Sequence, residues 1–160
     1  MTIDTKIGDA RDIVKSDNNL YDYIFLDAFT PAKCPCLWTV EFFEMLNTHL
    51  NDSGMLLTYS NSAAVRNAMI QAGFWVGKIY DKENDKYIGT IAAKKLELIK
   101  NGLSEYDLGL INTKAGIPYR DKNLTALNEA IIAAHDKEVS ESHLQSSSKF
   151  IKTFRGAKDV

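Results

Sequence analysis

The sequence predicts an α/β protein in which a largely parallel sheet is followed by a helical extension. Short apolar runs alternate with longer amphipathic stretches over residues 1–95, which is typical of repeated strand–helix units. Beyond residue 95 this alternation stops, and turns and helical patterns replace it. We therefore expect a partial α/β domain over residues 1–95 and a C-terminal helical extension over residues 96–160 that packs on it.

The N-terminal part reads as strand, helix, strand. Residues Thr2–Ile7 form a weak candidate strand, and Ala10–Lys15 form a short helix. The apolar run Tyr23–Leu26, bounded by Asp22 and Asp27, predicts a buried parallel strand.

Two further strand–helix units follow. Residues Leu37–Leu50 predict a helix with Thr39 as its N-cap, and Met55–Tyr59 predict the next strand. Residues Ser60–Ser62 then cap a helix that Gly73 ends in a left-handed conformation.

The sheet pattern closes with a strand pair. Residues Phe74–Tyr80 and Tyr87–Ala93 are joined by a short charged turn, which predicts an antiparallel hairpin. In the extension, Thr125–Glu141 predict a helix, and Phe150, Ile151 and Phe154 form a last apolar anchor.

The composition excludes several classes of protein. With 160 residues and a net charge of −2, the chain has the size of one domain and no overall excess of positive charge. Its apolar runs are far shorter than the roughly 20 residues of a membrane span. Cys34 and Cys36 stand one residue apart, and no second pair completes a zinc site. We expect a cytoplasmic protein with no membrane segment and no metal.

The C-terminal end is the one basic stretch. Lys149, Lys152, Arg155 and Lys158 are followed by no acidic residue until Asp159. Such a stretch can meet phosphate, or it can be a solvated basic end.

Two acidic residues follow predicted strands, Asp9 and Asp27. Ligands of open α/β sheets lie beyond the carboxyl ends of the parallel strands, where a carboxylate can accept hydrogen bonds or a proton. The same residue type also caps the helix that follows, so a purely structural role is open for both.

The segment after Asp27 is rich in rigid and aromatic residues. Pro31 and Pro35 restrict its backbone, and Phe29 and Trp38 offer flat apolar faces. A rigid aromatic loop beside a carboxylate suits a planar base, although the two aromatic side chains could instead pack on the sheet.

These residues resemble the methyltransferase domain of the MnmC type, which methylates the exocyclic amine of 5-aminomethyl-2-thiouridine at the tRNA wobble position. The resemblance is carried by Asp22–Lys33 with Pro35 and Leu37–Trp38, by Ile7–Ala10, by Gly54–Ser60 with Val65–Arg66 and Ala72–Phe74, and by Gly116–Asp121. It implies part of a Rossmann-like class I methyltransferase sheet, S-adenosylmethionine as cofactor and tRNA as partner.

The resemblance also assigns roles to individual residues. Asp27 would be the catalytic carboxylate beside the target amine. The substrate would be contacted by Phe29, Pro31, Lys33, Trp38 and Tyr59. The cofactor would be contacted by Asp9, Ala10, Asp27 and Ser60, and no metal is required.

The sequence departs from this family at the cofactor loop. Family members begin with a strand, a glycine-rich turn and a helix, whereas no Gly-x-Gly occurs here. In the family's strand order, 3-2-1-4-5-7-6, two strands separate the counterpart of residues 2–7 from the counterpart of Tyr23–Leu26. Without them an apolar sheet edge is exposed. We expect the Thr2–Ile7 strand or a second copy of the chain to cover it, and a separate polypeptide supplying the missing half is the third alternative.

Three functions follow. The first is methyl transfer to the amine of a modified wobble uridine. The second is a non-catalytic remnant, or half of a split methyltransferase, that retains RNA or partner binding. The third is a small-molecule transferase such as an aminopropyltransferase, which the proline-containing loop and residues 116–121 disfavour.

Overall fold

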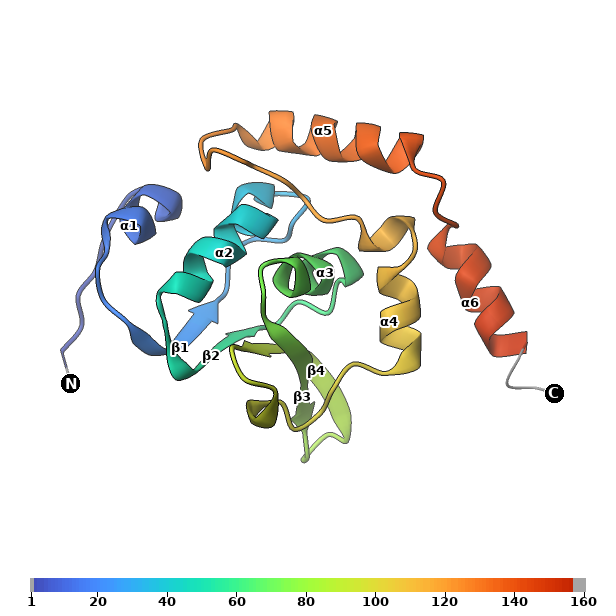
Figure 1. Cartoon of the computed structure of the whole chain (residues 1–160), viewed down its shortest axis with the longest axis horizontal. Coiled ribbons are helices and arrows are strands. Elements are labelled where there is room, and N and C mark those ends of the chain that lie inside the picture. Colours follow the sequence, from blue (N-terminus) through green and yellow to red (C-terminus); the bar gives the residue numbers. More distant parts are fainter. Residues whose placement is uncertain (1, 157–160) are drawn as a thin grey trace.

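The computed structural model describes residues 2–156 and contains one mixed four-stranded sheet (Figure 1). The strands are β1 (Tyr21–Leu26), β2 (Leu50–Thr58), β3 (Trp75–Asp81) and β4 (Lys86–Ala93). Their order is β1-β2-β4-β3, with β1 parallel to β2 and β4 antiparallel to both neighbours. This is the 4-5-7-6 part of the family order, so the predicted α/β class and the predicted hairpin are confirmed.

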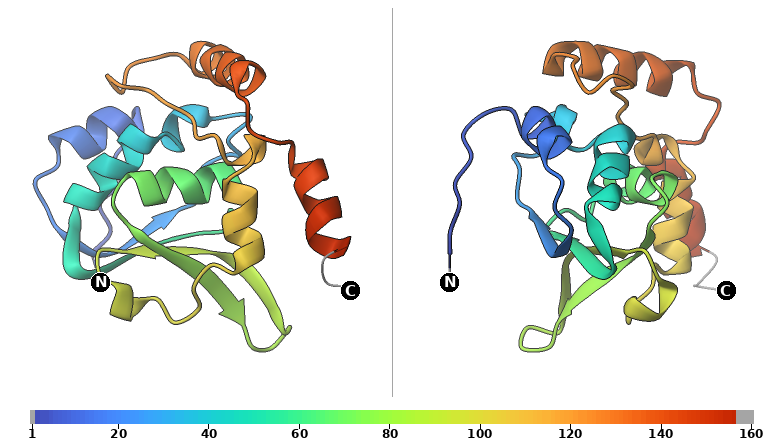
Figure 2. Two further views of the ribbon diagram at one scale, coloured as in Figure 1. Left: turned by 45° about the vertical axis from the view of Figure 1, so that its right-hand side comes forward. Right: turned by 60° about the vertical axis from the view of Figure 1, so that its left-hand side comes forward.

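Three helices cover one face of the sheet, α1 (Ala10–Ser16), α2 (Val40–Thr48) and α3 (Ala63–Gln71) (Figures 1 and 2). A short 3₁₀ turn, Pro35–Leu37, precedes α2, so the predicted helix begins later than Leu37. Thr39 caps α2 as predicted, because its hydroxyl accepts from the Phe42 N–H at 3.2 Å. Gly73 ends α3 with a φ of 87°, which L side chains rarely adopt.

The C-terminal extension is helical, as predicted. It contains 3₁₀ turns at Leu96–Leu98 and Lys114–Gly116, and helices α4 (Glu105–Ile111), α5 (Asn128–Glu141) and α6 (Ser147–Gly156). Helix α4 has too few apolar repeats to be recognised by periodicity. It is defined by a capping box, in which Ser104 and Asp107 bond to each other's backbone N–H groups.

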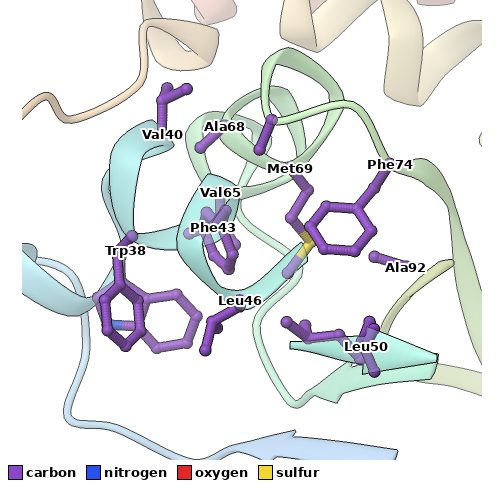
Figure 3. Packing of buried hydrophobic residues seen from close by; sticks show 13 residues of the cluster. Trp38, Val40, Phe43, Leu46, Leu50, Val65, Ala68, Met69, Phe74 and Ala92 are labelled. Atoms are coloured by element: carbon purple, nitrogen blue, oxygen red, sulfur yellow. The ribbon is translucent and has the colours of Figure 1, made fainter. Parts of the chain in front are cut away.

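The hydrophobic core lies between the helices and the covered face of the sheet (Figure 3). Phe43 and Leu46 of α2 meet Val65 and Met69 of α3 over Leu56 of β2, and all five are at most 4% exposed. Burial of these side chains, not helix propensity, holds helices of nine residues in place.

Strand β1 is buried on one face only. Ile24 and Leu26 pack against the core, whereas Tyr23 is 59% and Phe25 74% exposed. The prediction of a strand buried on both faces is therefore wrong for this chain, because helices cover only one face of the sheet and alternate side chains of β1 point away from them.

Residues 2–7 do not form the predicted strand. They have no regular secondary structure and do not pair with β1, so the expectation that they shift to cover its edge is also wrong. A groove of about 570 Å³ separates them from β1, with Asp4 and Lys6 on one side and Tyr21 and Tyr23 on the other.

Within residues 2–156, no helix has the length and apolar character needed to cross a bilayer.

The core assignment predicts a large difference between two phenylalanines. Phe43→Ala leaves a cavity at a site that is 0% exposed, and we expect it to lower the free energy of unfolding by about 3–5 kcal/mol. Phe25→Ala is the matched control and changes the free energy by about 0.5 kcal/mol or less. Urea denaturation of both variants measures this, and equal losses would contradict the assignment.

Candidate functional site

The candidate site is built around Asp27, the first residue after β1. The Asp27 carboxylate is exposed, and within residues 2–156 no hydrogen bond or ion pair occupies it. It lies at the carboxyl end of a parallel strand, where open α/β sheets place their ligands. Its acceptor oxygens are therefore available to a ligand.

Two side chains hold the loop that follows Asp27. The indole Nε1–H of Trp38 donates to the Phe29 carbonyl at 2.7 Å, and the Tyr59 hydroxyl donates to the Ala28 carbonyl at 2.8 Å. The Trp38 and Tyr59 rings meet edge to face with centroids 6.1 Å apart. The two residues directly after Asp27 are therefore fixed to the core and to the residue that follows β2.

Trp38 does not have the position that its predicted substrate contact requires. Its side chain is 0% exposed and packs in the core, as the alternative interpretation of this aromatic residue stated. We therefore assign Trp38 a positioning role. The other predicted substrate residues remain accessible, with Phe29 76% exposed, Tyr59 44% exposed, Lys33 exposed and Pro31 half-buried.

A hollow of about 360 Å³ adjoins Asp27 on the face of the sheet that the helices leave open. Residues of all four strands and the two residues that follow β1 and β2 line it, namely Phe25, Leu26, Asp27, Leu57, Thr58, Tyr59, Ile79 and Ile88. The lining is apolar except at Asp27, Thr58 and Tyr59, so a flat apolar group can sit there with one end at the carboxylate.

Ser60 lies in the interior next to this hollow. It is 7% exposed, and its carbonyl accepts from the Thr90 hydroxyl at 2.6 Å. Its own hydroxyl accepts from the Ser62 N–H at 3.4 Å. Ser60 thus closes the turn from β2 to α3, and its predicted contact with the cofactor stays a prediction.

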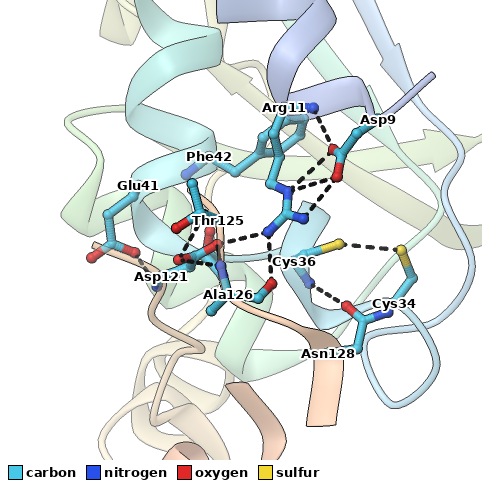
Figure 4. A network of polar contacts seen from close by, with 11 residues as sticks. Asp9, Arg11, Cys34, Cys36, Glu41, Phe42, Asp121, Thr125, Ala126 and Asn128 are labelled. Carbon is cyan, nitrogen blue, oxygen red and sulfur yellow. Dashed lines mark hydrogen bonds and ion pairs between the residues drawn. The ribbon is translucent and has the colours of Figure 1, made fainter. Parts of the chain in front are cut away.

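Asp9 and Ala10 lie at the start of α1. Asp9 is the N-cap, accepting from the Arg11 N–H at 2.9 Å, and its carboxylate pairs with the Arg11 guanidinium at 2.7 Å (Figure 4). Hydrogen bonds from Arg11 lower the pKa of Asp9, against a smaller effect of burial. The capping role of Asp9 is confirmed. Because Arg11 engages the Asp9 carboxylate, the predicted contact with adenine would use the backbone of Asp9 and Ala10 or a carboxylate lone pair that Arg11 leaves open.

Arg11 connects the two parts of the chain, which the sequence analysis did not anticipate. Its guanidinium donates to Asp121 at 2.9 Å and to the Ala126 carbonyl at 2.8 Å. Asp121 is 5% exposed, and its N–H donates to the Glu41 carboxylate at 2.8 Å. Asp121 belongs to the residue run 116–121 that the resemblance singled out, but only the structure shows its partner.

The two cysteines lie beside this ion-pair network. Their sulfur atoms are 3.6 Å apart, and both thiols are free. Burial, together with Cys34, raises the pKa of the Cys36 thiol to about 11, so Cys36 is a poor nucleophile at neutral pH. In the described part of the chain, no three His, Cys, Asp or Glu side chains are grouped so as to hold a metal ion.

The Asp9–Arg11 pair predicts a pH-dependent effect on stability. Because the folded-state pKa of Asp9 lies below its ordinary value of 3.8, the pair stabilises the fold above about pH 4 and is lost as the pH falls through the folded pKa. Asp9→Asn keeps a good N-cap but removes the charge, so we expect a loss below about 1 kcal/mol at pH 7 that shrinks toward pH 3. Urea denaturation across this pH range measures the loss. Asp4→Asn is the control, and a loss independent of pH would contradict the assignment.

Three comparisons with known proteins agree on one family. The model of the S-adenosyl-L-methionine-dependent methyltransferase family matches residues 1–95. A protein of Methanocaldococcus jannaschii described as uncharacterized is 29% identical over 144 residues, which is 89% of this chain and 40% of that protein. The tRNA 5-methylaminomethyl-2-thiouridine biosynthesis bifunctional protein MnmC of Pseudomonas entomophila is 33% identical over 99 residues, 58% of this chain and 15% of that protein.

The crystal structure of MnmC2 from Aquifex aeolicus matches the fold with a TM-score of 0.75 and 30% sequence identity. The match covers 84% of this chain and 44% of that structure. The chain therefore spans less than half the length of the relatives it matches. Sequence motif, sheet order and comparisons agree, and the chain belongs to the S-adenosyl-L-methionine-dependent methyltransferases as an MnmC-like member.

Proposed function

We propose that this chain takes part in methyl transfer from S-adenosylmethionine to the exocyclic amine of a modified wobble uridine in tRNA. The observation that carries the proposal is the unpaired Asp27 carboxylate at the end of β1, on a loop fixed by Trp38 and Tyr59. The match to MnmC supports the choice of substrate, because that protein is named for tRNA 5-methylaminomethyl-2-thiouridine biosynthesis.

In this proposal Asp27 is the catalytic residue. It accepts an N–H hydrogen bond from the target amine, orients the nitrogen lone pair and takes the proton that the amine gives up on methylation. The exposed ring of Phe29 and the half-buried Pro31 form one wall for the base, and the Tyr59 ring forms the rim. Lys33 supplies a cation for a neighbouring phosphate.

The residues present fit one part of S-adenosylmethionine. When bound, the cofactor supplies an electrophilic methyl group on a sulfonium. Asp27 and Ser60 would hold its reactive end, and the Asp9–Ala10 turn would meet its adenine. No glycine-rich turn within residues 2–156 offers the close backbone approach that the rest of the cofactor needs.

We therefore propose that another polypeptide completes the site at the groove between residues 4–6 and β1. In this proposal the groove takes the two strands that separate these segments in the family's strand order, because its lining includes residues of both segments. Because the groove is lined from both sides, inserted strands of a separate polypeptide fill it better than a second copy that only meets the β1 edge. Sedimentation of the purified chain distinguishes the two, as a dimer indicates the second copy.

The second candidate function is a non-catalytic remnant or one half of a split methyltransferase. The edge of β1, unpaired within residues 2–156, and the exposed rings of Tyr23 and Phe25, whose centroids are 6.3 Å apart, favour this second function for the chain taken alone. We also propose that the chain divides into residues 1–95 and residues 96–160, two parts that the Arg11–Asp121 ion pair joins. A cytoplasmic location is part of the same proposal.

The role of Asp27 predicts a loss of activity without a loss of structure. We expect Asp27→Asn to reduce methyl transfer from labelled S-adenosylmethionine to tRNA with an aminomethyl wobble uridine by about 10²- to 10⁴-fold. The free energy of unfolding should stay unchanged, because the carboxylate is exposed.

Asp22→Asn is the matched control. Asp22 lies on the same strand, is exposed and bonds only to Asn51 among the described residues, so its variant should transfer methyl groups like the wild type. Equal rates for Asp27→Asn and Asp22→Asn would contradict the proposed role.

A further inference from the structure

We propose that α6 and a hollow around Lys78 form a track for the phosphate backbone of the RNA substrate. The inference rests on the proposed function and adds the surface that binds the RNA away from the reacting base. It rests on two groups of cations, one on α6 and one in the hollow, and on Tyr106, which lines the hollow and contacts α6.

Helix α6 separates aromatic and basic side chains. Phe150 and Phe154 face α4, with ring centroids 5.9 Å and 5.3 Å from that of Tyr106. The contact is close, because a Cβ on Gly109 would overlap the Phe150 ring. Lys149, Lys152 and Arg155 recur every third residue on the other side and are exposed.

The charge of α6 is not compensated. No Asp or Glu occurs between Glu141 and the end of the helix, and within residues 2–156 no ion pair is formed by Lys149, Lys152 or Arg155. Helix α5, in contrast, pairs Lys137 with Glu141. A row of unpaired cations on one helix face is the pattern that binds a phosphate backbone.

The hollow beside α6 also has excess positive charge. It has a volume of about 270 Å³ and is lined in part by Arg66, Lys78, Asp107 and Tyr87. Both cations pair with the single carboxylate of Asp107, Arg66 at 2.8 Å and Lys78 at 2.9 Å. One positive charge is therefore left over, and Lys78 lies 4.1 Å from the centroid of the Tyr87 ring.

The hollow, the candidate site and α6 adjoin one another. Tyr106 lines the hollow and contacts both α6 phenylalanines. Asn61 also lines the hollow, and it follows Ser60 at the carboxyl end of β2. Helix α6 lies alongside α4 (Figure 2). Nucleotides flanking the target base can thus run from Asp27 over the hollow to α6.

The structure favours RNA over a membrane as the partner of α6. A basic amphipathic helix binds a bilayer by burying its apolar face in the lipid. In α6 that face is already packed against Tyr106 and Gly109. The exposed side chains of α6 are the three cations and small polar groups, which suits a phosphate backbone.

The test uses the full chain and a labelled RNA anticodon stem–loop, with binding measured by fluorescence anisotropy over a series of salt concentrations. We expect the triple variant Lys149→Gln, Lys152→Gln, Arg155→Gln to bind at least about tenfold more weakly at low salt. The slope of log affinity against log salt should fall by about two to three, one per lost phosphate contact. Lys78→Gln should lower the slope by about one, and Lys78→Arg should restore it.

The matched control removes three exposed lysines elsewhere, Lys15, Lys122 and Lys137, and should bind RNA with at most a small loss. Equal behaviour of the two triple variants would overturn the inference, as would wild-type binding to phosphatidylserine vesicles but not to RNA. If RNA binds through α6 and no methyl group is transferred, the proposed function fails and the inference stands. If methyl transfer occurs and the α6 variant binds RNA normally, the inference alone fails.

Discussion

The candidate site depends on one hydrogen bond, which the buried indole of Trp38 donates to the Phe29 carbonyl. A fully buried N–H without an acceptor costs free energy, so the core that buries Trp38 also fixes the backbone two residues beyond Asp27. Tyr59 fixes the adjacent carbonyl from β2. The loop is thereby rigid at its backbone while the Asp27 carboxylate and the Phe29 ring stay exposed. This combination suits a residue that must orient a substrate amine.

The second constraint is the exposed edge of the sheet. Within residues 2–156 no strand pairs with the outer edge of β1, and folded proteins normally cover such an edge. Tyr23 and Phe25 of the same strand stand on the open face of the sheet. The groove beside β1 is where we propose that further strands are added. The Arg11–Asp121 pair keeps α1 and the extension together.

Sequence reasoning predicted the features that local patterns determine. The order of strands and helices over residues 10–93, the Thr39 cap and the Gly73 stop follow from apolar periodicity and turn residues, and they are confirmed. The burial of β1 and the pairing of residues 2–7 depend on which other segments pack against them. No local pattern determines that, and these predictions were wrong. Trp38 was ambiguous because an aromatic residue in a loop packs or binds equally well by sequence. Arg11 and Asp121 are 110 residues apart in the sequence, so no local pattern predicts that they pair.

We would first titrate the purified chain with S-adenosylmethionine in a calorimeter and repeat the titration with Asp27→Asn. Because no glycine-rich turn within residues 2–156 approaches the cofactor, we expect the wild-type chain alone to bind it only at millimolar strength, and Asp27→Asn to bind it more weakly still. Binding at micromolar strength by the wild-type chain would contradict completion by another polypeptide, and would indicate that this chain or a dimer of it forms the whole cofactor site.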